Sequence, residues 1–207
     1  MSVLDQIVKA YDIRGTVPDQ LNADVAHALG VGFALFLRSN SNAERIVIAR
    51  DMRPSGPAFV EAFSRGVLNQ GIDVIDLGLG STDLMYYASG VLDAPGAMFT
   101  ASHNPAGYNG IKLCVAGARP VGVDTGLLDV KRVADEVLEG GGPKPAASAG
   151  SHSERDVLSD FAEHVLTFVD LADIGTLRVV ADTANGMGGL VVPAVMERIP
   201  SVELEVM

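Results

Sequence analysis

The segment from Thr100 to Lys112 gathers several side chains that can take part in catalysis. It reads Thr-Ala-Ser-His-Asn-Pro-Ala-Gly-Tyr-Asn-Gly-Ile-Lys, so the hydroxyl of Ser102 is followed by the imidazole of His103 and, at the end of the segment, by the amine of Lys112. Its proline and glycines give the backbone an irregular path and let it approach a ligand. A surface turn explains the Asn, Pro and Gly residues but not the reactive groups among them.

Phosphoryl transfer is the chemistry that this segment suits best. The reaction needs an oxygen held in line with phosphorus and cationic groups over the equatorial oxygens. A phosphate on Ser102 would carry about two negative charges at neutral pH. Lys112, His103 and backbone N–H groups could balance those charges. The sequence therefore predicts a phosphate-carrying serine at position 102.

Two other uses of these side chains have less support. In acyl transfer, His103 would deprotonate Ser102, but adjacent side chains on an extended chain point to opposite sides, and no Gly-x-Ser-x-Gly sequence is present. A zinc site is disfavoured because the histidine of this loop and the single cysteine, Cys114, lack the spacing of zinc ligands. Cys114 lies in an apolar run, and we expect it to be a small buried core residue.

Short β-branched runs alternate with helical patterns through the first part of the chain. Strands are predicted at residues 45–50, 72–77, 96–100 and 111–115. Helices are predicted after the N-cap Asn22, from Ser55 to Gln70, after the N-cap Ser81, and over 122–139. This alternation predicts an α/β fold with a mixed, mostly parallel sheet flanked by helices.

Two of the predicted strands end next to polar loops. The loops that follow Arg50 and Thr100 both leave the carboxyl ends of strands. Because ligand-binding loops of such sheets gather at that edge, we expect the two loops to face one cleft.

The composition changes after residue 139. Residues 140–153 are rich in Gly, Pro, Ala and Ser, which predicts a linker or exposed loop. Beyond them, patterns predict a helix, a strand, a helix and a strand at 154–169, 177–182, 187–198 and 202–207. We expect a first domain over 1–139 and an incomplete, similar α/β domain over 154–207, because about 55 residues are few for a domain.

The charge balance limits the partners that the chain is expected to have. The formal net charge is -11 and the pI is about 4.6, which disfavours nucleic acid and anionic membrane surfaces. Any anion site must be built locally from a few basic side chains and backbone N–H groups. The start of the chain shows no signal peptide, and its longest apolar stretch, near residues 31–37, is too short to span a bilayer. We therefore expect a cytoplasmic protein.

Four segments of the chain resemble the α-D-phosphohexomutases. Thr-Ala-Ser-His-Asn-Pro followed by Gly-Tyr-Asn-Gly-Ile-Lys is similar to the active-serine loop of that family. The other three, in the same order as in the family, resemble its N-terminal substrate loop, its arginine loop and the opening of its second domain, at Lys9–Gly15, Ala49–Gly56 and Val180–Gly188. Tyr-Asp-Ile-Arg-Gly favours the phosphomannomutase/phosphoglucomutase branch.

The resemblance implies roles for individual residues. Ser102 would hold the phosphate that is lent to the sugar, and its oxygen would be one ligand of Mg²⁺. Lys112 and Arg14 would assist proton transfer or stabilise the bridging oxygen. Tyr11 would contact substrate, or only pack. His103 would orient the sugar hydroxyl or act as an acid or base.

Two further arginines have both a functional and a structural reading. In the resemblance, Arg50 and Arg53 support the serine loop rather than touch the sugar. Either one could instead pair with Asp51 or with the C-terminus of a helix.

The implied reaction exchanges the 1- and 6-phosphates of mannose or glucose. Ser102 would pass its phosphate to a hexose monophosphate, giving a hexose 1,6-bisphosphate that returns its other phosphate to the serine. The family has four domains, and its acidic metal loop, Asp-Gly-Asp-x-Asp-Arg, occurs nowhere in these 207 residues. We therefore expect an N-terminal fragment that is inactive alone, with the other Mg²⁺ ligands beyond its end.

Other functions remain open at this point. The chain could be a non-catalytic remnant that binds sugar phosphate or a partner chain, or a small phosphorylatable regulatory domain. If neighbouring domains are missing, exposed apolar surface would favour self-association.

Overall fold

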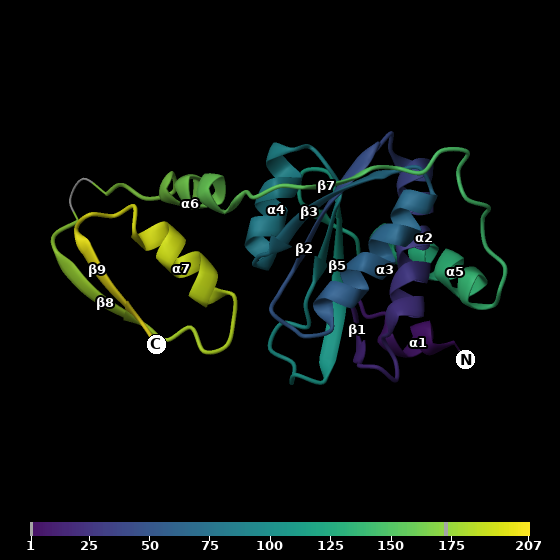
Figure 1. Cartoon of the computed structure of the whole chain (residues 1–207), viewed down its shortest axis with the longest axis horizontal. Coiled ribbons are helices and arrows are strands. Elements are labelled where there is room, and N and C mark those ends of the chain that lie inside the picture. Colours follow the sequence, from purple (N-terminus) through teal and green to yellow (C-terminus); the bar gives the residue numbers. More distant parts are fainter. Residues whose placement is uncertain (1, 172–173) are drawn as a thin grey trace.

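A seven-stranded mixed sheet lies at the centre of the computed structural model, which describes residues 2–171 and 174–207 (Figure 1). Its strands are β1 (Ile13–Thr16), β2 (Arg45–Arg50), β3 (Asp73–Leu79), β4 (Gly96–Phe99), β5 (Tyr108–Val115), β6 (Arg119–Pro120) and β7 (His152–Glu154). The order is β1-β5-β4-β2-β3-β7, with β6 paired to β5. Strands β4, β2, β3 and β7 run parallel, whereas β5 is antiparallel to β1 and β4. The predicted mixed, mostly parallel sheet is confirmed.

Helices cover both faces of this sheet. The α-helices of the described chain are α1 (Val3–Ile7), α2 (Ala23–Asn40), α3 (Gly56–Asn69), α4 (Thr82–Val91), α5 (Leu127–Leu138), α6 (Leu158–Leu166) and α7 (Gly188–Met196), of which α7 packs against α6 and β9 instead. Helices α2, α3 and α5 share one core cluster with the sheet, and α4 and α6 share a second cluster on the opposite face. No helix in the described part of the chain is long and apolar enough to cross a membrane.

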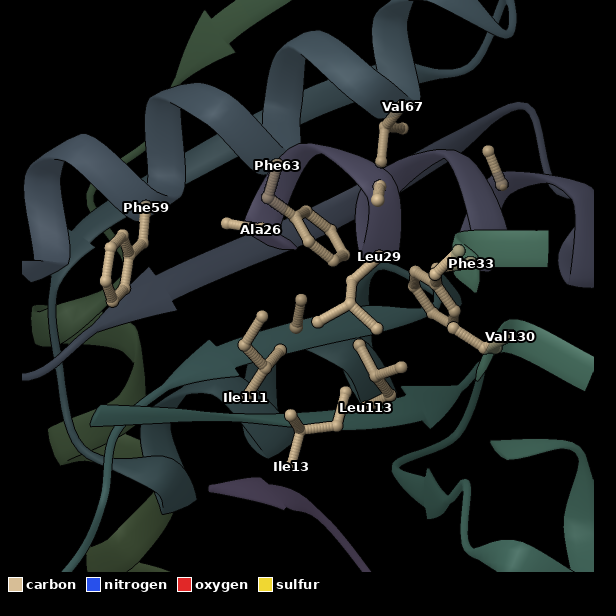
Figure 2. Close-up of a cluster of buried hydrophobic side chains, with 14 of the residues drawn as sticks. Ile13, Ala26, Leu29, Phe33, Phe59, Phe63, Val67, Ile111, Leu113 and Val130 are labelled. Carbon is tan, nitrogen blue, oxygen red and sulfur yellow. The ribbon is translucent and has the colours of Figure 1, made fainter. Parts of the chain in front are cut away.

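Alternation along β2 shows why both faces are covered. Ile46 and Ile48 belong to the cluster beneath α2 and α3, while Val47 and Ala49 belong to the cluster beneath α4. Because side chains of a strand alternate between faces, an apolar run of this kind needs helices on both sides. Figure 2 shows the first cluster, with Phe63 among the side chains between the helices and the sheet.

Helices α2 and α3 pack with their backbones in close contact. A Cβ added to Gly30 of α2 would overlap the carbonyl oxygen of Phe63, and one added to Gly66 of α3 would overlap the carbonyl oxygen of His27. The two glycines therefore set the distance between the helices, which in turn places the start of α3 beside the end of β2.

The predicted helix ends are partly confirmed. Asn22 accepts a hydrogen bond from the Val25 N–H at 3.0 Å, and Ser81 accepts one from Leu84 at 3.2 Å. Ser55 makes no capping bond, because its own backbone is already helical, and its hydroxyl accepts from Asn109 Nδ2 at 2.8 Å instead.

The helix expected over 122–139 is two helices. A 3₁₀ turn at Val123–Thr125 precedes α5, and Gly126 separates them with a φ of 122° that favours glycine.

The segment after α5, predicted over 140–153 as a linker or an exposed loop, is largely exposed and forms a strap that is bonded to the end of α3. Ala146 and Gly150 donate backbone hydrogen bonds to Asn69 and Leu68 at 2.8 and 2.9 Å, and the strap then enters the sheet as β7 beside β3. The helix expected from residue 154 starts only at Leu158, since Glu154 pairs in the sheet. Figure 1 shows the strap running from α5 to α6.

The last part of the chain contains a parallel strand–helix–strand unit. Strands β8 (Leu177–Ala181) and β9 (Val202–Val206) pair in parallel, and α7 connects them. Helix α6 contacts α4 of the first part, where the rings of Phe161 and Tyr87 lie 5.7 Å apart. The domain division into residues 1–139 and 154–207 stays a prediction.

Candidate functional site

Ser102 lies on an exposed loop directly after β4. Its backbone adopts a left-handed conformation, with a φ of 56°, and its side chain is exposed. The Ser102 N–H donates to the hydroxyl of Thr100 at 2.9 Å, and the Asn104 N–H donates to the carbonyl of Ala101 at 3.0 Å. These two bonds hold a sharp turn that projects the serine hydroxyl away from the core.

Arg53 holds the rest of this loop through its main chain. Its Nη1 donates to the carbonyl oxygens of Pro105 and Tyr108, both at 2.8 Å. Its Nη2 donates to the carbonyl oxygens of Ser102 and Asn104, at 3.0 and 2.7 Å. The residue is buried, so the loop is wrapped around a guanidinium group rather than around water.

A buried carboxylate completes this support. Asp51 Oδ2 accepts from Arg53 Nε at 3.2 Å and from the Thr100 hydroxyl at 2.7 Å. All five N–H donors of the Arg53 guanidinium are thus engaged, and none is left for a ligand. The structural and loop-supporting readings of Arg53 both hold, and the loops after β2 and β4 do meet at one edge.

A cluster of charged side chains lies beside the serine loop. The carboxylate of Asp12 accepts from Arg14 Nε at 2.8 Å and from Lys112 Nζ at 3.0 Å. Arg14 Nη1 also donates to the side-chain oxygen of Asn104, in the Ser102 loop, at 2.7 Å. Two cations share one anion, so the cluster has a net positive charge in an otherwise acidic chain. The structure thus brings Arg14 and Lys112 together, next to the loop that carries the serine.

His103 is closer to Ser102 than the sequence suggested. Its Nδ1 lies 3.4 Å from the serine Oγ, so the expectation that the two side chains point apart is wrong. The physical reason is the left-handed backbone at Ser102, because the opposite-side rule applies only to extended chain. His103 contacts no carboxylate among the described residues, so the third member of a hydrolytic triad is not seen there.

The remaining predicted site residues are not joined to this cluster. Tyr11 is 75% exposed, and no hydrogen bond of its hydroxyl is found within the described residues. Its ring edge lies beside the backbone of Gly122. The side chain of Arg50 lies beside Gly56 at the start of α3, and no hydrogen bond joins it to the serine loop among the described residues. The roles assigned to both residues stay predictions.

Sequence reasoning missed Asp12, Thr100 and Asn104. Asp12 stands two residues before Arg14, a spacing that places both side chains on one side of an extended segment. Thr100 also stands two residues before its partner, since its hydroxyl accepts a hydrogen bond from the Ser102 N–H. Nothing in the sequence pairs Asp12 with Lys112, which lies far away along the chain.

The described residues do not by themselves form a divalent cation site. None of their His, Cys, Asp and Glu side chains form a group of three or more that could hold a metal ion. Near the loop, the oxygen-rich candidate is Asp12, and its carboxylate is already shared by two cations. Mg²⁺ at Ser102 therefore stays a prediction of the resemblance.

The sequence of this chain is similar to those of several known proteins. The family model described as phosphoglucomutase/phosphomannomutase, alpha/beta/alpha domain I, matches residues 5–131. A protein named phosphohexose mutases from Xanthomonas campestris is 40% identical over 194 residues, which cover 93% of this chain and 41% of that protein. A phosphomannomutase from Escherichia coli is 37% identical, with 92% of this chain and 41% of that protein covered.

Solved structures give the same result. The crystal structure of a phosphoglucomutase/phosphomannomutase family protein from Burkholderia thailandensis matches with a TM-score of 0.81 and 30% identity. The match covers 97% of this chain and 43% of that one. The chain therefore spans less than half the length of the relatives it matches.

Proposed function

The chain belongs to the phosphoglucomutase/phosphomannomutase family, and we propose that it supplies the phosphoserine of an enzyme that interconverts hexose 1-phosphate and hexose 6-phosphate. Mannose and glucose phosphates are the substrates favoured by the name of the family and by that of the Escherichia coli relative. The observation that carries the proposal is the exposed Ser102 hydroxyl, on a loop fixed by Arg53 and bordered by the Arg14–Asp12–Lys112 cluster.

The geometry supports phosphoryl transfer in a simple way. The oxygen of a sugar hydroxyl bonds to the phosphorus on Ser102 and releases its proton to water, while the bond between phosphorus and Oγ breaks. The departing Oγ takes up a proton, and His103 Nδ1, at 3.4 Å, is placed to exchange a proton with it. The product of this half-reaction is a hexose 1,6-bisphosphate, and the second half-reaction returns the other phosphate to Ser102.

The cation cluster stabilises the charge that develops during transfer. The phosphoryl oxygens carry the negative charge of the transition state, so preorganised donors beside them lower the barrier. Arg14 is held by Asp12 and Asn104, and Lys112 is held by Asp12, so neither has to be reoriented when substrate binds. If Mg²⁺ binds at the phosphorylated serine, it would neutralise part of the negative charge on the phosphoryl oxygens.

A chimera tests the function directly. The corresponding N-terminal part of the Xanthomonas relative is replaced by this chain, and conversion of mannose 1-phosphate to mannose 6-phosphate is followed in a coupled assay. We expect turnover, and a loss of more than about a thousandfold in the Ser102→Ala chimera. Ser39→Ala, at an exposed serine of α2, is the matched control.

Two results would count against the proposal. One is a Ser102→Ala chimera that turns over as fast as the parent. The other is an intact mass without any phosphoserine after the folded chimera has been incubated with glucose 1,6-bisphosphate. For the 207-residue chain alone we expect no turnover in the same assay.

A further inference from the structure

A cavity of about 530 Å³ lies on the other side of β2 from the Asp51–Thr100 contacts, between α3 and the edge of the sheet. Its lining residues are Arg50, Pro57, Val60, Glu61, Ser64, Arg65, Leu68, Asp76 and His152. None of them belongs to the Ser102 loop or to the Arg14–Asp12–Lys112 cluster. The volume is in the range of sites that bind small molecules, about 300 to 1,000 Å³.

The charges around this cavity leave one cation without a partner. Glu61 lies 3.4 Å from Arg65, and Asp76 accepts a hydrogen bond from the Gly78 N–H at 2.8 Å, so neither carboxylate is paired with Arg50. Arg50 is half-buried, and its guanidinium makes no hydrogen bond or ion pair with any described residue. A guanidinium group that is partly removed from water, with its donors free, favours an anion beside it.

A second unpaired group lines the same cavity. Ser64 is 4% exposed, and its hydroxyl has no hydrogen-bond partner among the described residues. A buried hydroxyl without a partner costs free energy, and most such groups in folded proteins are paired. The serine therefore has a donor that no described protein group uses.

We propose that this cavity binds a small organic oxyanion, such as a phosphate monoester, with Arg50 as its counter-ion and the Ser64 hydroxyl as a donor. The apolar body of the ligand would lie against Pro57, Val60 and Leu68, which form the rest of the α3 wall. A metal cation is disfavoured, because Arg50 adds a positive charge and Glu61 is already paired with Arg65.

The cavity is adjacent in sequence to Asp51, which supports the serine loop, but Asp51 does not line it. Arg50 is followed directly by Asp51, whose carboxylate holds Thr100 and Arg53. The Arg50 side chain points to the α3 face, where its Cδ approaches Gly56. An anion bound to Arg50 would therefore lie next to the residue that precedes Asp51, the carboxylate that supports the serine loop.

Phenyl phosphate is a suitable probe, because it combines an oxyanion with an apolar ring. We expect a titration of the 207-residue chain, followed by ¹H–¹⁵N NMR, to shift the amides of α3 between Val60 and Leu68 and those of β7. Arg50→Gln is expected to weaken binding about tenfold. Arg132→Gln, which removes one exposed charge on α5, is the matched control and should leave the affinity unchanged.

Ser64→Ala gives a test that does not depend on the folding of Arg50→Gln. Removing an unpaired buried hydroxyl should keep or raise the melting temperature of the free protein, yet weaken phenyl phosphate binding severalfold. A serine that only packs would not lower the affinity.

The competing anion site is the cluster beside Ser102. If the amide shifts occur only in residues 101–112 and vanish in Arg14→Gln, the anion binds there and the proposal is overturned. Equal affinities of the parent, Arg50→Gln and Ser64→Ala would overturn it as well. Because no enzymatic activity is measured, these outcomes are independent of the proposed mutase function.

Discussion

At the scale of single residues, Arg53 decides the shape of the serine loop. Its guanidinium draws in the carbonyl oxygens of Ser102 and Pro105, among others. Since C=O and N–H point in opposite directions in a trans peptide, the N–H groups of His103 and Ala106 face away from Arg53. Neither donates to another described residue, so both are available to an anion on the outer side of the loop.

Replacing Arg53 by lysine should loosen this loop without changing its charge. One ammonium group has three donors and no planar fork, so it leaves at least two of the five acceptor contacts unmade. We expect a loss of stability of about 1 to 3 kcal/mol and faster amide hydrogen exchange in residues 101–108. Thermal unfolding and exchange measured by mass spectrometry check both effects.

The control is Arg132→Lys, at an exposed pair with Glu136 on α5, which should change stability by less than about 0.5 kcal/mol. Unchanged exchange in the serine loop of Arg53→Lys would contradict the role given to Arg53.

At the scale of elements, the contact between α2 and α3 depends on glycine. Gly66→Ala adds a methyl group where the carbonyl oxygen of His27 lies, so the helices must separate. The expected cost is about 1 to 3 kcal/mol, more than the gain of up to about 1 kcal/mol in helix propensity. Gly90→Ala in α4 is the matched control, because no atom lies within 4 Å of its added Cβ.

Urea unfolding of the two variants measures the difference. Gly90→Ala should be neutral or stabilising, while Gly66→Ala should unfold at lower urea. Equal midpoints would show that the two backbones are not in the close contact described.

The same helix pair contains a group that makes stability depend on pH. Burial, followed by the nearby charge of Arg65, holds the pKa of His27 below its ordinary value of about 6.5. The unfolded chain therefore binds more protons than the folded one as the pH falls below that value, and stability is lost. We expect the free energy of unfolding to decrease less between about pH 7 and about pH 5 in His27→Gln than in the parent.

Chemical denaturation at a series of pH values checks this difference. A parallel pH dependence of parent and variant would show that His27 titrates alike in the folded and unfolded chain.

The sequence predicted much of the element order because local patterns carry it. The run at Arg45–Arg50 has a β-branched apolar centre and the run at Gly96–Phe99 is apolar, and they form the central parallel strands β2 and β4. Strand β7 was missed because His152–Glu154 is polar and exposed, and its place is decided by the free edge of β3. The residues around His152–Glu154 contain no pattern that predicts pairing with β3.

The chemistry of the site was more predictable than its connections. Residue types alone identified Ser102, His103 and Lys112 as candidates. The ion pair between Lys112 and Asp12 depends on contact between β5 and the segment before β1. The loop that carries Ser102 depends on Arg53, which follows β2. Contacts of this kind across the fold have no local signal in a single sequence.

At the scale of the whole molecule, exposed apolar side chains are frequent in the C-terminal part. Phe168 is 73% exposed and Val169 is 54% exposed, and Val180 on β8 is 55% exposed. Surface of this kind often marks contacts with other chains or domains. We expect the isolated 207-residue chain to self-associate at high concentration.

Sedimentation velocity over a range of concentrations tests this expectation. Phe168→Ser should weaken the association, whereas Leu128→Ser, at an equally apolar exposed site on α5, should not. A single sedimentation coefficient at every concentration would contradict it.

The strap between α5 and β7 is held to the rest of the molecule by hydrogen bonds as well as by the chain itself. Residues 140–145 are mostly exposed, whereas the chain from Ala146 onward is bonded to α3 and β3. A protease that cuts within residues 140–145 would therefore nick the chain without releasing either piece. The two fragments would stay together through an edge strand of the sheet and part only under denaturing conditions, as in a split protein that reassembles without a covalent link.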